Sequence, residues 1–299
     1  MSPFTSLTRL APLALALSAT PLMAENAAPA AAKPAAPAAA KPSAPAAPAQ
    51  LVFQNGRSIP LSSVDIAQDK VLIKTAADGF GAGQSFPLTA VSHVFGDRPA
   101  ELNQAIALLL FDRHKEAIDL LEPLLATHRV SAKIPGNFWL ESARTLLVCY
   151  ALTGDAARCT QLGKDISDAT PPQGSDPFVS LGKALLMPAS VSPEDREVSL
   201  KDLTADEMPA DVAAYASFYR SRLLKEQKKN VEALQALLAV PCLFPSGGLI
   251  LNAAAEIQAS DLLAGLGRRD EATHLLNSAL RVAQGTILTE EGNKRLESM

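Results

Sequence analysis

The chain has 299 residues, enough for one large domain or two small ones, and a formal net charge of −4. Residues 1–49 carry a net charge of +2, so the rest of the chain carries −6. A mildly acidic body argues against nucleic-acid binding, which depends on Lys and Arg, and aromatic residues, at 5%, are too few for base-stacking platforms. Hydrophobic residues make up 48% of the chain. This share excludes a disordered acidic chain, and the many Ala and Leu residues favour helix over strand.

The first 24 residues have the order of charge and hydropathy that is typical of a secretory signal peptide. Arg9 gives a positive start, Leu10–Ala19 is a short apolar run, and Ala24 offers a small residue before a cleavage site. The apolar run is shorter than the roughly 20 residues of a transmembrane helix. An uncleaved membrane anchor is the alternative. We therefore expect export, with the periplasm of a Gram-negative envelope as the destination.

Residues 25–50 are expected to form a linker. Ala27–Ala49 contain 14 Ala and 6 Pro. Frequent Pro prevents a continuous helix, and this composition cannot build a core, so the segment is typical of an extended, semi-rigid chain of polyproline II character. Such a linker would hold a folded body away from a tether or membrane, and an inert tail is the alternative.

Residues 51–97 are expected to form a small β-module, because apolar and polar residues alternate there with a period of two. Asn55–Gly56 is a strong signal for a tight hairpin, and Gln68–Asp69 and the glycine-rich Gly79–Gly83 supply further turns. We expect five or six short strands in an antiparallel meander or SH3-like barrel. Gly79–Gly83 is not expected to bind phosphate, because Gln84–Leu88 looks like a strand instead of the helix that such a loop requires.

From residue 98 to residue 285 the hydrophobic period becomes helical, and four segments repeat one pattern. Each has a Leu-rich helix, a tight polar turn and a second helix that opens with a small anchor residue. The anchors are Ala117, Cys159, Ala233 and Ala272, at spacings of 42, 74 and 39 residues. Because the middle gap equals two periods of 37, a fifth, degenerate pair is expected, with helices at Phe178–Met187 and Glu194–Leu203.

These helix pairs resemble tetratricopeptide (TPR) repeats. Nine residues before the anchor the family expects a large apolar residue or Tyr, supplied here by Leu108, Tyr150, Leu224 and Leu263. Twelve residues before it a small residue is expected, which holds for Ala105, Ser221 and Ser260 but not for Leu147. Four residues after it a bulky apolar residue is expected, which holds for Leu121, Leu237 and Leu276 but not for Gly163.

The resemblance implies a mainly α fold, an α-solenoid of about five helical hairpins preceded by the small antiparallel β-module. Stacked pairs would cover each other's apolar stripes and leave a concave face suited to a peptide or partner helix. The whole layout is similar to exported bacterial proteins that join a short β-module to TPR-like repeats. Residues 286–299 are expected to form a C-terminal capping helix, with Thr289 before two acidic residues at its start.

No catalytic constellation is evident, so we expect a protein that is not an enzyme and uses no cofactor. The four His residues lack the i, i+4 spacing and the Glu of a helical zinc site, and no metal site is expected. Gly163–Lys164 and Gly182–Lys183 lack both the following Ser or Thr and the preceding glycine-rich loop of a Walker motif. An enzyme with an unrecognised site is the remaining alternative.

Two cysteines could form a disulfide. Cys149 and Cys159 flank the predicted turn Thr153–Asp155 on antiparallel helices, and an exported protein meets conditions that permit a bond. The alternative is that Cys159 is a small packing residue with a free thiol. Cys242 has no evident partner.

Helical phase indicates one candidate partner surface. On the first helix of the fourth pair, four residues recur on one face: Tyr215, Phe218, Arg222 and Lys225. Comparable positions on the second and fifth pairs hold Glu141, Arg144, Ile257 and Asp261. Aromatic rings beside cations suit peptide recognition, and Arg can hold the carboxylate of an acidic or C-terminal segment. The alternative is that Tyr215 and Phe218 pack against the neighbouring repeat.

The sequence therefore favours an exported, non-catalytic scaffold that binds a peptide or partner protein of the cell envelope on the concave face of the repeats. The first alternative is a cell-wall or envelope-polymer binding protein that acts through the β-module. Nucleic acid is not expected as a partner, and membrane contact is expected only if the signal segment stays uncleaved. The oligomeric state is left open.

The first prediction concerns the mature N-terminus. Because the small residue Ala24 follows the apolar run, cleavage should leave Glu25 as the first residue of a protein found in the cell envelope. N-terminal sequencing of the protein from an envelope fraction measures this. An intact Met1 in a soluble cytoplasmic pool would contradict it.

Overall fold

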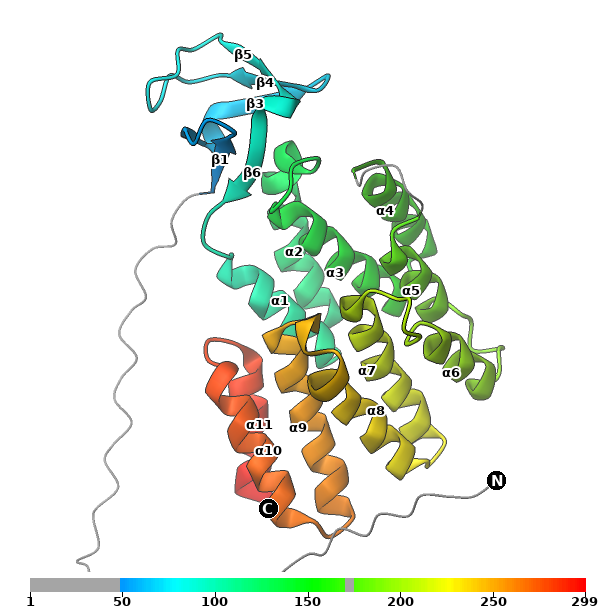
Figure 1. Cartoon of the computed structure of the whole chain (residues 1–299). Coiled ribbons are helices and arrows are strands. Elements are labelled where there is room, and N and C mark those ends of the chain that lie inside the picture. The colour runs from blue at the N-terminus through cyan, green and yellow to red at the C-terminus, as the bar shows by residue number, and fades with distance from the viewer. Residues whose placement is uncertain (1–48, 170–174) are drawn as a thin grey trace, which may run out of the picture. The chain divides into compact units, whose positions relative to one another are not determined.

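The computed structural model describes residues 49–169 and 175–299, which hold six short β-strands followed by eleven α-helices (Figure 1). The predicted signal peptide and nearly all of the predicted linker lie outside the described residues. The described chain is mainly helical, with a small antiparallel β-module before the helices, as composition and periodicity indicated.

The β-module contains two three-stranded antiparallel sheets, in the orders β2-β1-β6 and β3-β4-β5. Its strands are β1 (Gln50–Phe53), β2 (Ser58–Pro60), β3 (Val64–Ala67), β4 (Lys70–Ile73), β5 (Ser85–Pro87) and β6 (Val91–Phe95). Both expected hairpins form. Gln68 and Asp69 both have positive φ between β3 and β4, as the favoured two-residue hairpin turn requires. Between β1 and β2 only Gly56 has a positive φ, of 81°, and the N–H of Phe53 donates to the carbonyl of Arg57. The loop at Asn55–Gly56 is therefore longer than the two-residue turn that the sequence predicted.

The glycine-rich loop Gly79–Gly83 serves the core of the β-module. It connects β4 to β5, so a strand follows it, as the sequence indicated. Phe80 is buried, stacks on Phe53 with ring centroids 5.0 Å apart and meets Phe86 edge-on at 5.6 Å. The guanidinium of Arg57 covers this ring at 3.9 Å. The aromatic residue of the loop is therefore a core residue of the module.

One short segment between helices contacts the β-module. Ile134, which is 2% exposed, packs into the core of the module, and the N–H of Val94 on β6 donates to the carbonyl of Pro135 at 2.9 Å. Gly136 has a φ of 74°, and a Cβ there would lie 2.8 Å from the carbonyl oxygen of Val94. Only glycine fits this approach without strain.

The helices form five consecutive pairs and a final single helix. The first helices of the pairs are α1 (Ala100–Leu110), α3 (Phe138–Leu152), α5 (Pro177–Leu185), α7 (Ala210–Glu226) and α9 (Leu249–Gly265). Their partners are α2 (His114–His128), α4 (Ala156–Ala169), α6 (Pro193–Asp202), α8 (Asn230–Leu243) and α10 (Arg269–Val282), and α11 (Ile287–Ser298) ends the chain. The third pair lies where the repeat spacing placed it. Thr286, and not Thr289, caps α11, because its hydroxyl accepts from the N–H of Leu288.

Four of the five pairs share one turn geometry. Each turn has a central residue in the left-handed conformation, namely Asp112, Gly154, Lys228 and Gly267. The N–H of the next residue donates to the carbonyl nine positions before the anchor, on Leu108, Tyr150, Leu224 and Leu263. All four anchors are at most 5% exposed. The third pair departs from this geometry, because the longer segment Leu186–Ser192 connects α5 to α6.

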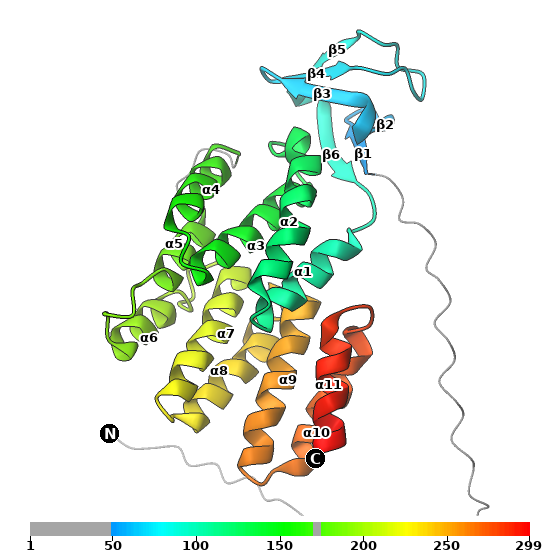
Figure 2. The same cartoon turned by 180° about the vertical axis from the view of Figure 1, so that it is seen from behind.

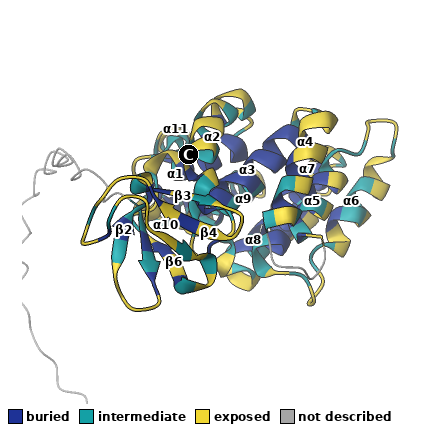
Figure 3. Ribbon diagram, turned by 90° about the horizontal axis from the view of Figure 1, so that it is seen from above, coloured by how far each residue is buried: buried dark blue, intermediate teal, exposed yellow. Residues whose placement is uncertain are grey.

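The first helix of the chain also packs against the last ones. α1 contacts α9 and α11, and the three helices lie together in Figure 2. The carbonyl of Leu110, at the end of α1, accepts hydrogen bonds from Arg222 of α7 and Gln258 of α9. The N–H of Ile287 donates to the side chain of Gln104 at 3.1 Å. The central helices α3 and α9 are largely buried (dark blue in Figure 3), α3 mainly by α2, α4 and α5 and α9 mainly by α8 and α10.

The predicted disulfide does not form in this structure. Cys149 and Cys159 are both buried and both free. The Sγ of Cys159 is directed to the carbonyl of Leu147, 3.8 Å away, because the residue fills the small anchor position between the two helices. Burial raises the pKa of both thiols, which disfavours their reactive thiolate forms.

None of the helices in residues 49–169 and 175–299 combines the length and the hydropathy that crossing a bilayer requires.

The second prediction tests the contact between the β-module and the α2–α3 connection. Gly136→Ala adds a backbone clash to the cost of positive φ, whereas Gly267→Ala, at a φ of 79° with open space around it, adds the φ cost alone. We expect Gly136→Ala to lower the free energy of unfolding by at least ~1 kcal/mol more than Gly267→Ala. Denaturant unfolding measures both variants. Equal losses would show that Val94 and Gly136 are not in close contact.

Candidate functional site

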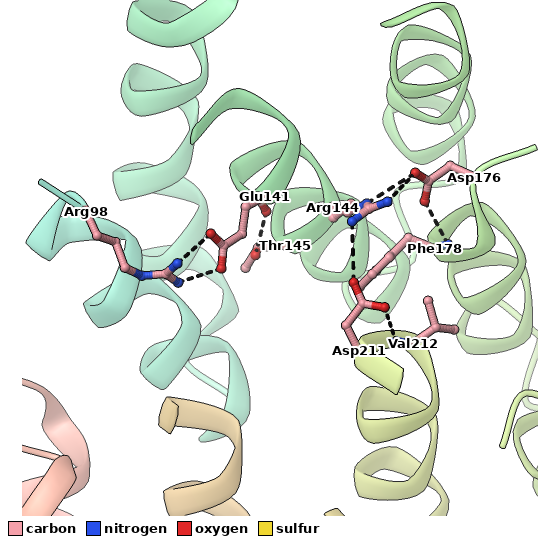
Figure 4. A network of polar contacts seen from close by, with 8 residues as sticks. All are labelled: Arg98, Glu141, Arg144, Thr145, Asp176, Phe178, Asp211 and Val212. Carbon is pink, nitrogen blue, oxygen red and sulfur yellow. Dashed lines mark hydrogen bonds and ion pairs between the residues drawn. The ribbon is translucent and has the colours of Figure 1, made fainter. Parts of the chain in front are cut away.

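A cleft of about 580 Å³ lies where the N-terminal ends of α1, α3, α5, α7 and α9 meet. The first turns of these helices, the turn before α9 and the C-terminal end of α10 supply its lining. Charged side chains from α3 and α7 and from the residues just before α1 and α5 form a polar network along one wall (Figure 4). The cleft collects residues that are more than one hundred positions apart in the sequence.

The side chains of this wall are held by the way the helices begin. The Oδ1 of Asn137 accepts from the N–H of Leu140 at 2.8 Å and so caps α3. Asp176 caps α5 by accepting from the N–H of Phe178 at 3.0 Å, and Asp211 accepts from the N–H of Val212 at 2.9 Å at the start of α7. Helix starts favour carboxylates because the N-terminal N–H groups carry partial positive charge.

Arg144 joins three helices at the centre of the network. Its Nη2 lies 2.7 Å from the carboxylate of Asp176, its Nη1 lies 3.4 Å from that of Asp211, and its guanidinium covers the ring of Phe178 at 5.0 Å (Figure 4). The side chain of Asp176 is only 2% exposed, so removal of Arg144 would leave a buried carboxylate without its ion-pair partner. Arg144 is therefore part of the framework of the cleft as well as of its surface.

The second pair of the network is more open to solvent. Arg98, just before α1, donates two parallel hydrogen bonds of 2.5 Å to the carboxylate of Glu141, and its Nε donates to Asn103. The two paired side chains are 39% and 42% exposed. Such a two-pronged arrangement fixes both side chains in one geometry.

Exposed apolar side chains also line the cleft. Leu249, at the start of α9, is 67% exposed, and Val282, at the end of α10, is 42% exposed. Leu249 directly follows the turn Ser246–Gly248, which also lines the cleft and whose last glycine has a φ of 111°. The cleft thus offers hydrogen-bond donors, carboxylate acceptors and exposed apolar surface within one space.

Three of the eight residues predicted to bind a partner line this cleft: Glu141, Arg144 and Tyr215. Tyr215 is only 6% exposed and packs edge-on against Phe178 with ring centroids 5.6 Å apart. Burial raises the pKa of its hydroxyl. Tyr215 therefore forms part of the cleft lining but exposes little surface to a partner.

The remaining residues of the predicted α7 face lie elsewhere. Phe218 is fully buried and packs edge-on against Tyr219 of the same helix, so a partner cannot reach it. Arg222 binds the carbonyl of Leu110 and the carboxylate of Asp112 and covers both rings at just over 5 Å. Lys225 is exposed near the end of α7, outside the cleft. The predicted face is therefore divided between core, interhelical contact and solvent.

The two predicted partner-binding residues of α9 make contacts within the protein instead. Ile257 is fully buried, and Asp261 forms an ion pair with Arg295 of α11 at 2.9 Å. Both hold α9 to its neighbours because α11 covers this side of the helix.

The sequence argument from helical phase did not identify five residues of the site: Arg98, Asp176, Asp211, Leu249 and Val282. A usable signal existed in the sequence: polar or charged residues stand at or just before the start of alternate helices, at Asn137, Asp176 and Asp211. If the first helices run in the same direction, these residues share one end of the fold. That parallel arrangement is tertiary information, which helical phase within one helix does not contain.

Within residues 49–169 and 175–299, no group of three or more His, Cys, Asp or Glu side chains is placed to share a metal ion. No family model, curated protein or solved structure matches this chain.

The third prediction concerns Arg222, which holds the end of α1 to α7. Arg222→Ala leaves the carbonyl of Leu110 with one donor fewer and uncovers two buried rings, so the free energy of unfolding should fall by about 1–3 kcal/mol. Lys225→Ala on the same helix is the control and should change it by less than ~0.5 kcal/mol. Thermal or denaturant unfolding measures both. An Arg222 variant as stable as the control would contradict a structural role.

Proposed function

We propose that the protein is an exported, non-catalytic scaffold that binds a peptide or a partner protein in the cleft at the N-terminal ends of the first helices. In this proposal the helix pairs form a TPR-like α-solenoid, and the signal peptide delivers the protein to the periplasm. The four hairpins with one turn geometry support the repeat, and the segment order of residues 1–24 supports export.

The observation that carries the proposal is the combination of a polar wall and an exposed apolar rim in one cleft. A peptide backbone presents N–H and C=O groups in alternation, and the wall presents guanidinium donors and carboxylate acceptors in alternation, from Arg98 and Glu141 to Arg144 and Asp211 (Figure 4). Leu249 and Val282 would cover an apolar side chain of the same segment.

The rigidity of the wall also favours binding. Asn137, Asp176 and Asp211 are fixed as helix caps or first-turn acceptors, and the charged side chains bind one another. A site whose side chains are already ordered loses less conformational entropy when a partner binds. The cleft is therefore preorganised for a short extended segment.

The fourth prediction uses cross-linking from inside the cleft. A photo-cross-linking residue in place of Leu249 should form an adduct with a partner protein in intact cells, since this side chain is 67% exposed at the rim. The same residue in place of Val231, which is 54% exposed on α8 and outside the cleft, is the matched control and should give no such adduct. Gel shift and mass spectrometry of the adduct measure the result.

A second change tests whether the charged wall contributes. Glu141→Lys removes the bidentate ion pair with Arg98 and puts two positive charges side by side in the wall. If the charged wall binds the partner, the yield of the adduct at position 249 should decrease at least fivefold. Glu232→Lys, in the first turn of α8, makes the same charge change away from the cleft and should leave the adduct unchanged. Equal adducts at positions 249 and 231, or none at either, would remove the cleft from the function.

A further inference from the structure

A second cavity, separate from the cleft, lies between α4 and α5. This slot has a volume of about 300 Å³, and both helices beside it pack on α3. Its inner surface is formed by Leu147, Cys159, Gly163, Val179 and Leu186. Three of these, Leu147, Cys159 and Gly163, are buried, so the slot reaches the core of the helical region.

The slot lies beside a repeat position that carries no side chain. Four residues after the anchor, the first, fourth and fifth pairs carry a fully buried Leu, at positions 121, 237 and 276. The second pair carries Gly163 there, the one departure from this position of the pattern. A Cβ on Gly163 would meet Val179 and Leu147 only at ordinary contact distances of 3.5–3.6 Å. A methyl group therefore fits at this position, in contact with Val179 and Leu147, and the cavity lies beside these side chains.

Leu147 fills only part of the space. It stands twelve residues before the anchor, where the other three pairs carry a small, fully buried residue, so the second pair exchanges the small and the large position. The side chain of Leu147 would lie 3.6 Å from a Cβ on Gly163 and 2.7 Å from a Cβ on Gly182, and it lines the slot together with Gly163.

Both Gly-Lys dipeptides of the sequence meet at this slot. Lys164 and Lys183 follow Gly163 and Gly182 on α4 and α5, line the cavity and are exposed. Neither forms an ion pair with another residue in the described ranges. With Asp168 as the other charged residue of the lining, the mouth carries a net charge of +1 on a body of −6. An apolar interior with unpaired cations at its opening is complementary to an amphiphilic anion.

We propose that this slot is a binding site for a medium-chain carboxylate, with the hydrocarbon chain beside Gly163 and the carboxylate between Lys164 and Lys183. At ~30 Å³ for each water-sized group, 300 Å³ holds roughly ten non-hydrogen atoms, the size of a nine- or ten-carbon chain. The chain gains from leaving water, and the head group gains two charge-assisted hydrogen bonds at the mouth. This site is independent of the partner cleft.

Titration calorimetry of the mature chain with decanoate, below its micelle-forming concentration, tests the proposal. Saturable one-to-one binding is expected, with 1-decanol and decyltrimethylammonium each at least tenfold weaker because neither carries a negative charge that the two lysines could pair with. Lys164→Gln with Lys183→Gln should weaken decanoate at least tenfold and abolish its advantage over 1-decanol. Lys115→Gln with Lys201→Gln, on exposed positions outside the slot, is the matched control and should leave binding unchanged.

Gly163→Leu tests the interior of the slot, since it restores the residue of the other pairs. It should abolish decanoate binding while the helical circular dichroism is retained. If this variant does not fold, the lysine variants decide the question alone. The proposal is overturned if decanoate shows no saturable binding, if folded Gly163→Leu binds as well as the parent, or if the double lysine variant keeps its affinity.

Discussion

The arrangement of the helices depends on how the end of α1 is held. The carbonyl of Leu110 accepts from Arg222 of α7 and Gln258 of α9, and α11 binds the same first helix through Gln104. These contacts join elements that are more than one hundred residues apart, so they bring the C-terminal halves of α1, α7 and α9 together. The N-terminal ends of the same helices then border the cleft, where charged side chains fill the wall.

Local rules of helix formation account for much of that wall. A carboxylate at a helix start satisfies N–H groups that have no partner within the helix, and Asp176 and Asp211 do this for α5 and α7. Because Arg144 lies between them, the buried carboxylate of Asp176 holds a guanidinium that lines the cleft beside Asp211. The cleft is thus ordered by the same interactions that begin its helices.

The repeat is regular in its turns and irregular in its packing. Four turns place a left-handed residue at the centre and make the same backbone hydrogen bond, because a three-residue connection between antiparallel helices allows few conformations. The side chains between the helices vary more freely. In the second pair the small and the large residue are exchanged, with Leu147 on α3 and Gly163 on α4, and both residues line the slot. A departure from the repeat pattern at two positions therefore coincides with the proposed binding site.

The sequence by itself determined the local elements: the two hairpins of the β-module, the helix pairs with their buried anchors and the site of the third pair. These follow from periodicity, turn residues and small residues at close contacts, all of which are short-range properties. Only the tertiary structure decided which side chains are accessible. Phe218 and Arg222 share a helical face with Tyr215, yet one is core, one binds α1 and one borders the cleft. That distinction depends on which distant helix covers each turn of α7, and the phase of one helix carries no information about its distant neighbours.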